Sequence, residues 1–123
     1  MTETNFEHAD RVSLPWPPKD LSPNARVHWL KKSKSAKAYR KACWALCKEA
    51  KITAPKDGPI HLWIDFYPPD RRKRDDDNMI ANFKSGRDGI ADALGVDDNR
   101  FICHPLVRDE VGGMVKFRIT EGV

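Results

Sequence analysis

The stretch from Asp70 to Asp98 reads DRRKRDDDNMIANFKSGRDGIADALGVDD, and the rest of the chain is organised around it. Four cationic residues at positions 71–74 run directly into three carboxylates at positions 75–77. Concentrating like charges costs electrostatic energy unless a partner outside the chain offsets the charge. A polyanion offsets the basic run, and a cation offsets the acidic run. Because a phosphodiester with a bound divalent metal supplies both, the stretch predicts contact with such a ligand.

A structural role is the alternative for the acidic residues. Asp and Asn are favoured at helix starts, where acidic groups also complement the helix dipole. One aspartate is explained in this way. Three in succession, followed by Asn78 and by a second acidic pair at Asp97 and Asp98, exceed what a cap requires. We therefore favour a functional role for these carboxylates.

Apolar residues at helical spacing follow the acidic run and end before Gly95, a residue type favoured just after a helix end. The pattern predicts a helix over residues 79–94 and places residues 75–78 at a strand-to-helix junction. Gly86 and Gly89 each weaken a helix by about 1 kcal/mol relative to Ala, which predicts close approach to another backbone or a local break. The apolar positions are Met79 or Ile80, Phe83, Gly86, Ile90 and Leu94.

Other segments show the periods of strands and of one further helix. Apolar and polar residues alternate from Pro59 to Tyr67, which is typical of a half-buried strand. A helix starts at Ser33 or Ser35, with an apolar stripe that runs from Tyr39 to Ala50. Shorter alternations predict an opening strand at Arg11–Trp16 and two final strands, Arg100–Arg108 and Met114–Thr120, joined by a hairpin turn.

The predicted order of elements is therefore β-α-β-α-β-β. This order indicates a single α+β domain whose helices pack on one mixed sheet. A length of 123 residues allows one core but not two. We expect residues 1–10, which are polar, to be poorly ordered, and residues 11–123 to form the domain.

Composition limits the functional classes. The sequence has neither a run of 18 apolar residues nor a signal-peptide pattern, so we expect a cytoplasmic protein without a membrane partner. Three cysteines without C-x-x-C spacing argue against a disulfide framework and a zinc site, and we interpret them as small buried residues. The net charge is +4, and Leu21–Lys48 contains eight basic residues and no acidic one. Such a block is typical of a polyanion-binding surface.

The segment before the second helix mixes cationic, polar and aromatic residues, as a nucleic-acid contact loop does. It includes Asn24, Arg26 and Trp29. For Trp29, core packing and nucleic-acid contact remain open as two interpretations.

The acidic residues suit a magnesium site, because Mg²⁺ prefers hard oxygen ligands and is held by one or two carboxylates together with substrate phosphates. Asp75 and Asp77 point the same way if the backbone before the helix is extended. Asp98 reaches the same point only if the helix doubles back or another subunit contributes. Converging carboxylates of this kind predict a metal-dependent nuclease. The stretch lacks the glycine and glutamate of an EF-hand loop, and the chain contains no Walker motif.

These residues resemble the RusA family of Holliday junction resolvases. The similarity lies in RRKRDDDN at residues 71–78, a helix that ends DALG at residues 92–95, the Asp97–Asp98 pair and the opening LPWPP at residues 14–18. The resemblance implies a small, phage- or prophage-derived, homodimeric endonuclease that cuts four-way DNA junctions with magnesium. It further implies that Asp75, Asp77 and Asp98 are the catalytic metal ligands.

The same resemblance implies a helix lysine in the site, for which Lys84, seven residues after Asp77, is the candidate. Seven residues are two helical turns, so Lys84 lies on the face of Asp77 in a continuous helix. Asn24 resembles a polar position near the family's site. The alternatives are a non-catalytic DNA-binding dimer and a nuclease that acts on flaps or forks. The predicted DNA-binding residues are Asn24, Arg26, Lys31, Lys32, Lys34, Lys37, Arg71, Arg72, Lys73 and Arg74.

Overall fold

Strand β2 (Ile60–Tyr67) is an inner strand of the sheet in the computed structural model, which describes residues 11–121. Its even-numbered residues, from Ile60 to Phe66, are fully buried, whereas its odd-numbered residues, from His61 to Tyr67, face away from the core. The predicted strand is thus confirmed. The expectation that residues 1–10 are poorly ordered lies outside the described residues.

The sheet is mixed, with four strands in the order β1-β4-β2-β3. Strand β4 (Met114–Glu121) lies between β1 (Val12–Pro15) and β2 and is antiparallel to both. Strand β3 (Phe101–Val107) is parallel to β2 and forms one edge of the sheet. The α+β class and the mixed sheet therefore agree with the prediction, whereas two α-helices, not one, lie between β2 and β3.

The predicted hairpin between the last two strands is wrong. Strand β2 separates β3 from β4, so the segment 108–113 crosses the end of β2 instead of turning tightly. The N–H groups of Gly112 and Gly113 donate to the Pro68 carbonyl at 2.9 and 3.2 Å, which fixes this crossing beside the end of β2. A Gly-Gly pair supports a turn, but it does not determine which strand the chain joins next.

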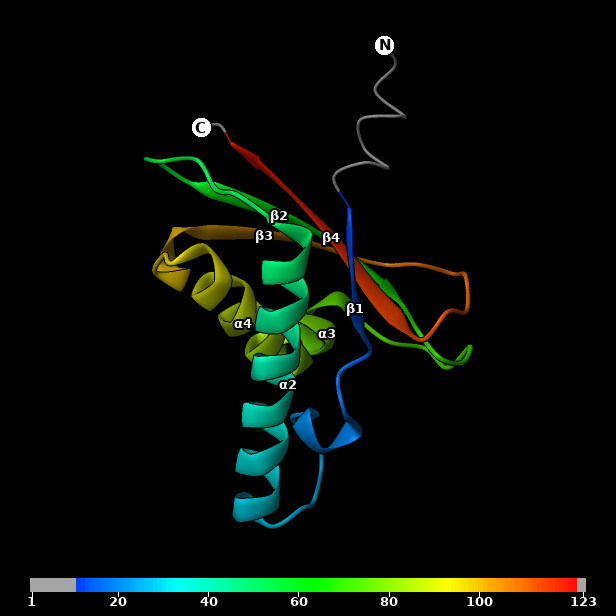
Figure 1. Ribbon diagram of the computed structural model, residues 1–123. Helices are drawn as coiled ribbons and strands as arrows, with labels where there is room; N and C mark the ends of the chain where they lie inside the picture. The colour runs from blue at the N-terminus through cyan, green and yellow to red at the C-terminus, as the bar shows by residue number, and fades with distance from the viewer. Residues whose placement is uncertain (1–10, 122–123) are drawn as a thin grey trace.

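All the α-helices lie on one face of the sheet, as Figure 1 shows. Helix α2 (Trp29–Ala50) buries Tyr39, Cys43 and Cys47 against this face. Helices α3 (Asp76–Asn82) and α4 (Lys84–Leu94) complete the layer. Two single-turn 3₁₀ helices, Lys19–Leu21 and Asp98–Arg100, flank the larger elements. Among residues 11–121, none of the helices combines the length and the apolar character needed to cross a membrane.

Helix α2 begins at Trp29, four or six residues before the predicted start at Ser33 or Ser35. The side chain of His28 is its cap, because the ring nitrogen Nδ1 accepts a hydrogen bond from the Leu30 N–H at 3.1 Å. Ser, Thr, Asp and Asn are the residue types preferred as helix N-caps, so the sequence did not indicate that a histidine would cap this helix.

The single helix predicted over residues 79–94 is instead two helices that meet at Phe83, where φ is −90° and ψ is 4°. Gly89 confirms the predicted close approach to another backbone, since a Cβ at this position would lie 2.5 Å from the Arg40 carbonyl oxygen of α2.

Cys43 and Cys47 are fully buried, as expected, whereas Cys103 is only partly buried. Burial raises the pKa of the Cys43 thiol to about 11 and that of Cys47 to about 12.

Candidate nucleic-acid and metal site

Asp70 organises the basic run that follows β2. Its carboxylate accepts the Arg72 N–H at 3.0 Å and pairs with the guanidinium groups of Arg72 and Arg74 at 3.2 and 3.0 Å. The hydrogen bond from Arg74, reinforced by those from Arg72, holds the pKa of Asp70 well below its usual range. The chain therefore offsets part of the positive charge itself, which the sequence argument did not include.

The four cations of the run do not have equivalent roles. The Arg74 side chain is 15% exposed and lies over the ring of Trp16, with 5.6 Å between the guanidinium carbon and the ring centroid. It also donates to the Arg72 carbonyl at 3.0 Å, so Arg74 shapes the segment. Arg71 and Lys73 are exposed, and no carboxylate among residues 11–121 forms an ion pair with either. These two cations remain available to a ligand.

The acidic run forms the start of α3. Asp75 is the cap: its Oδ1 accepts the Asn78 N–H at 2.8 Å, and its Oδ2 accepts the Asn78 side-chain amide at 3.1 Å. The prediction of extended backbone through Asp77 is wrong, because the helix begins at Asp76. Residues two apart in a helix do not face the same direction, so strand alternation does not align Asp75 with Asp77. Asp76 and Asp77 are exposed in the first turn.

A groove of about 590 Å³ connects this helix start with the opening segment of the chain. It brings Asn24 together with the basic run although nearly 50 residues separate them, so these predicted DNA-contact residues do lie on one surface. We call this surface the basic groove. It is lined by Trp16, Pro17, Lys19, Ser22, Asn24, Pro69, Arg72, Lys73, Arg74, Asn78, Met79 and Asn82.

Asn82, like Lys19 and Asn78, lines the basic groove but was not predicted as a candidate from the sequence. Its Oδ1 atom is buried and accepts no hydrogen bond from the residues that the structure describes. A buried acceptor without a partner is costly in a folded protein, so a donor or a cation from outside the chain suits this position. Asn82 follows Asn78 by one helical turn, and this i, i+4 spacing of amides was the available signal.

Lys84 does not line the basic groove. It is the first residue of α4, its side chain is 66% exposed, and its Nζ lies 3.5 Å from the Asp88 carboxylate. The break at Phe83 removes the continuous helix on which its predicted alignment with Asp77 depended. The neighbouring Asp92 accepts two hydrogen bonds from Arg40 of α2, at 2.7 and 2.9 Å, and these lower its pKa.

The second acidic pair lies at the opposite end of the sheet from the first. Asp97 caps the short helix before β3, and Asp98 forms an ion pair with Arg87 at 3.6 Å. Asp75 follows the end of β2, whereas Asp98 precedes the start of β3. Because these strands are parallel, Asp98 lies toward the end of the sheet where β2 begins, whereas the segment that leads to Asp75 leaves β2 at its other end.

The predicted metal ligands Asp75, Asp77 and Asp98 therefore do not meet within one chain. In residues 11–121, no three His, Cys, Asp or Glu side chains are grouped as a metal ion would require. Oxygen ligands of one Mg²⁺ lie within about 4 Å of each other, since each Mg–O distance is about 2.1 Å. Of the two routes open to Asp98, the helix doubling back does not group the three carboxylates within residues 11–121.

The other predicted DNA-contact residues form a second basic surface, the basic arm, which consists of residues 26–37. Lys31, Lys34 and Lys37 are exposed on the first half of α2, and Arg26 is exposed in the loop before it. Lys32 donates to the Ser22 carbonyl at 3.4 Å, and Ser35 donates to Asp20 at 2.9 Å. These two bonds fasten the loop to the helix.

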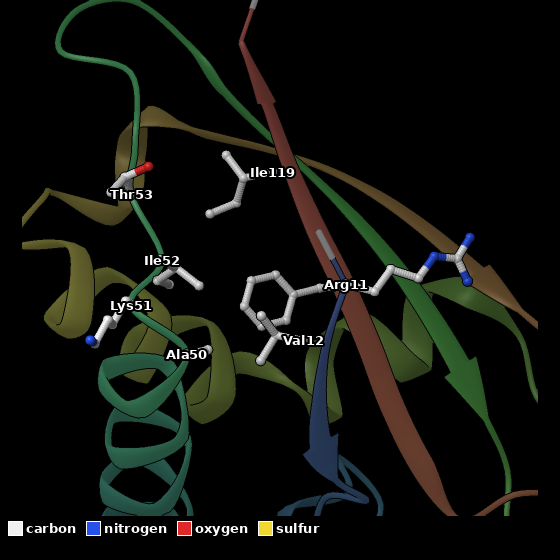
Figure 2. Close-up of a pocket in the computed structure, with 8 residues that line it drawn as sticks. Arg11, Val12, Ala50, Lys51, Ile52, Thr53 and Ile119 are labelled. Carbon is white, nitrogen blue, oxygen red and sulfur yellow. The ribbon is translucent and has the colours of Figure 1, made fainter. Parts of the chain in front are cut away.

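A separate cavity of about 270 Å³ lies where the end of α2 meets β1 and β4. Figure 2 shows Val12, Ile52 and Ile119 turned toward one another around it, while Arg11 extends away to the other side of the sheet. There Arg11 pairs with Asp65 at 3.3 Å. None of the predicted site residues lines this cavity, so it is not part of the site.

The fold and the site together define a small α+β protein with a groove lined by basic residues beside a carboxylate-rich helix start. No family model matches the chain. An uncharacterized protein of Xylella fastidiosa (strain Temecula1) is 54% identical over 114 residues, which cover 89% of this chain and 74% of that protein. The crossover junction endodeoxyribonuclease RusA of Shigella sonnei is 30% identical over 117 residues, which cover 89% of this chain and 92% of that enzyme.

The enzyme of the same name from Escherichia coli K12 is also 30% identical over 117 residues, and that of Enterobacteria phage 82 is 29% identical. These similarities extend over nearly the whole length of each protein. The chain belongs to the RusA family of crossover junction endodeoxyribonucleases.

Proposed function

We propose that this protein is a magnesium-dependent endodeoxyribonuclease that resolves four-way DNA junctions by paired, symmetric cuts. The observation that carries the proposal is the carboxylate-rich first turn of α3, which opens beside a groove lined by Arg72, Lys73 and Asn24. Family membership supports it, since the relatives named above are crossover junction endodeoxyribonucleases.

The basic residues bind and position the DNA backbone. Lys73 and Arg71 are exposed and contact phosphates directly, while Asp70 and Arg74 hold the segment in the shape that presents them. The amides of Asn24 and Asn78 donate hydrogen bonds to the same backbone within the basic groove. Because each phosphate contact releases counterions, affinity decreases steeply with salt.

The carboxylates of a homodimer form two composite sites. Asp75 and Asp77 of one chain, with Asp98 of a second chain, would hold the metal, because the topology separates these groups within one chain. Their hard oxygen atoms fit Mg²⁺, and Asn82 Oδ1 is a further unpartnered oxygen at the same groove. When bound, the ion supplies an activated water and stabilises the leaving oxygen of the phosphodiester.

A dimer also suits the substrate. A four-way junction has two strands of like polarity related by approximate twofold symmetry, and resolution requires one cut in each. A C₂ dimer presents two identical sites to them. Lys84, which is held near the start of α4 by Asp88, is the cation that stabilises charge on the scissile phosphate once the DNA is bound.

A cleavage assay tests the proposal. The substrates are a 5′-labelled four-way junction, a linear duplex, a flap and a fork, each with Mg²⁺ or with EDTA. We expect cutting of the junction alone, and only with Mg²⁺. Asp77→Asn abolishes cutting but retains binding, because it removes a ligand and an anion that faces phosphate. Asp76→Asn, at the exposed neighbour in the same turn, is the matched control and retains cutting.

Three results contradict the proposal. Binding of the junction without cleavage in Mg²⁺ identifies a non-catalytic DNA-binding protein. Faster cutting of flaps or forks identifies a nuclease of different substrate. Unfolding of Asp77→Asn, measured by thermal melting, assigns the carboxylate a purely structural role.

A further inference from the structure

The first turn of α2 extends away from the core. The first fully buried residue of this 22-residue helix is Tyr39, Ala36 is partly buried against the core, and residues 29–31 at the start are exposed. Figure 1 shows this part of α2 reaching past the sheet and the other helices. The bonds from Lys32 to Ser22 and from Ser35 to Asp20 hold it in place. The start of α2 therefore projects from the domain but is held to the preceding loop by these two hydrogen bonds.

Two large apolar side chains stand at this tip. Trp29 is 70% exposed and Leu30 is 54% exposed, which excludes the core-packing interpretation of Trp29. One face of the Trp29 ring is supported by the His28 ring, with centroids 5.8 Å apart and an interplanar angle of 26°. His28 is itself fixed as the helix cap. An aromatic ring held in this way loses little conformational entropy when a flat ligand stacks on it.

The rings of Trp16 and Trp63 are covered by neighbouring side chains, and Trp44 is less exposed than Trp29. Trp63 lies between the His104 ring, with centroids 3.9 Å apart, and the Arg118 guanidinium, 5.1 Å from the ring centroid. Trp16 packs edge-on against Phe66 beneath Arg74. Trp44 is 39% exposed but lies on the body of α2, in a pocket beside Asp92 of α4. Among the described residues, only His28 forms a ring contact with Trp29.

The positive charge around Trp29 indicates which class of ligand it contacts. Arg26, Lys31 and Lys34 are exposed next to it, and no acidic residue occurs from Leu21 to Lys48. A membrane-facing or protein-facing apolar tip does not require this excess of positive charge, whereas a polyanion complements it. A flat aromatic surface inside a cationic surface matches a nucleobase attached to its phosphates.

We propose that Trp29 stacks on an unstacked base at the branch point of the DNA junction, with Leu30 as an adjoining wedge, and that this contact lets the protein prefer branched over linear DNA. The inference rests on the proposed function, because it names how that substrate is recognised. A base in a continuous duplex is already stacked on both sides, so it gains nothing from Trp29. Apolar wedges inserted at base steps act in this way in other DNA-distorting proteins.

Binding of wild-type and variant protein to a junction and to a linear duplex tests the proposal, with Ca²⁺ in place of Mg²⁺ to avoid cutting. We expect Trp29→Ala to bind the junction about tenfold more weakly and to bind the duplex within about twofold of wild type. Trp29→Tyr keeps most of the preference, because it retains an aromatic face. Trp44→Ala is the matched control and keeps the full preference. Melting temperatures of the Trp29 variants stay unchanged, because the side chain is exposed.

Photocrosslinking supplies a readout of position. 5-Iodouracil at the branch point should crosslink to the peptide that contains Trp29, and 5-iodouracil in the middle of an arm should not. The inference is overturned if Trp29→Ala keeps the junction preference, if it weakens junction and duplex equally, or if the branch-point crosslink maps elsewhere. If the preference depends on Trp29 but Mg²⁺ elicits no cutting, the nuclease proposal fails and the stacking role stands. A wild-type protein without junction preference refutes both.

Discussion

A composite active site predicts that two inactive chains restore each other. Asp77→Asn removes a proposed ligand at the start of α3, and Asp98→Asn removes one before β3, at the opposite end of the sheet. Each homodimer lacks a ligand in both sites and is inactive. In a heterodimer of the two variants, one site receives Asp77 from one chain and Asp98 from the other, so it is complete.

The expected magnitude follows from the geometry. The carboxylates are not grouped within residues 11–121, whereas ligands of one ion lie within about 4 Å of each other. We therefore expect no metal site to form from the ligands of one chain alone. Each heterodimer has one complete site of two, so it cuts at about half the wild-type rate per dimer. Its product is a nicked junction, because the second strand is not cut.

The assay uses co-expressed chains with different affinity tags, purified through both tags, and a labelled junction that separates nicked from resolved products. The converse heterodimer, wild type with the Asp77→Asn, Asp98→Asn double variant, is the control: both of its sites lack one ligand, so it does not cut. If the two heterodimers behave in the opposite way, the ligands come from one chain and the reasoning from strand topology is refuted.

Further predictions concern the start of α3, the contact between α2 and α4, and the basic run. Asp75→Ala should lower the free energy of unfolding by about 1 kcal/mol in urea titration through loss of the cap, whereas Asp75→Asn should keep stability and lose only cleavage. Gly89→Ala should destabilise the protein by about 1–3 kcal/mol in the same titration, because its Cβ meets a carbonyl 2.5 Å away; a gain in stability would show that the helices can separate. Arg71→Ala should weaken junction binding and lower its salt dependence without changing the melting temperature, whereas Arg74→Met should lower that temperature. Since Arg74 lowers the pKa of Asp70, the associated stability is present above pH of about 4 and is lost as pH falls through the lowered pKa; NMR titration should show that Arg74→Met returns this pKa toward its usual value.

Local periodicity predicted the elements well, but not their ends or their neighbours. The alternation in β2 was sufficient to identify its buried face, because a strand with one covered face repeats every two residues. The cap of α2 was missed because a histidine ring replaces the usual hydroxyl or carboxylate. The hairpin was wrong because strand pairing depends on distant residues: β4 pairs with β1 and β2, which lie far from it in the sequence.

The site was predictable as a set of residue types, but only partly as a geometry. The basic run and Asn24 do share a groove, which their separation in sequence did not indicate. The ion pairs of Asp70 with Arg72 and Arg74 were not predicted from the sequence. Residue spacing alone does not distinguish a cation that pairs within its own segment from one that faces a ligand. Similarly, spacing alone cannot show that Asp98 lies beyond the reach of Asp75.

The position of β4 between β1 and β2 affects the order in which the domain can assemble during synthesis. Strand β1 pairs with β4 alone, and β4 is the last strand of the described chain, so the opening segment has no place in the sheet until residues 114–121 have left the ribosome. That segment carries Trp16 and Asn24, which form one wall of the basic groove. A chain with long-range pairing of this kind folds late and cooperatively. The nascent polypeptide therefore has no assembled basic groove until strand β4 is in place.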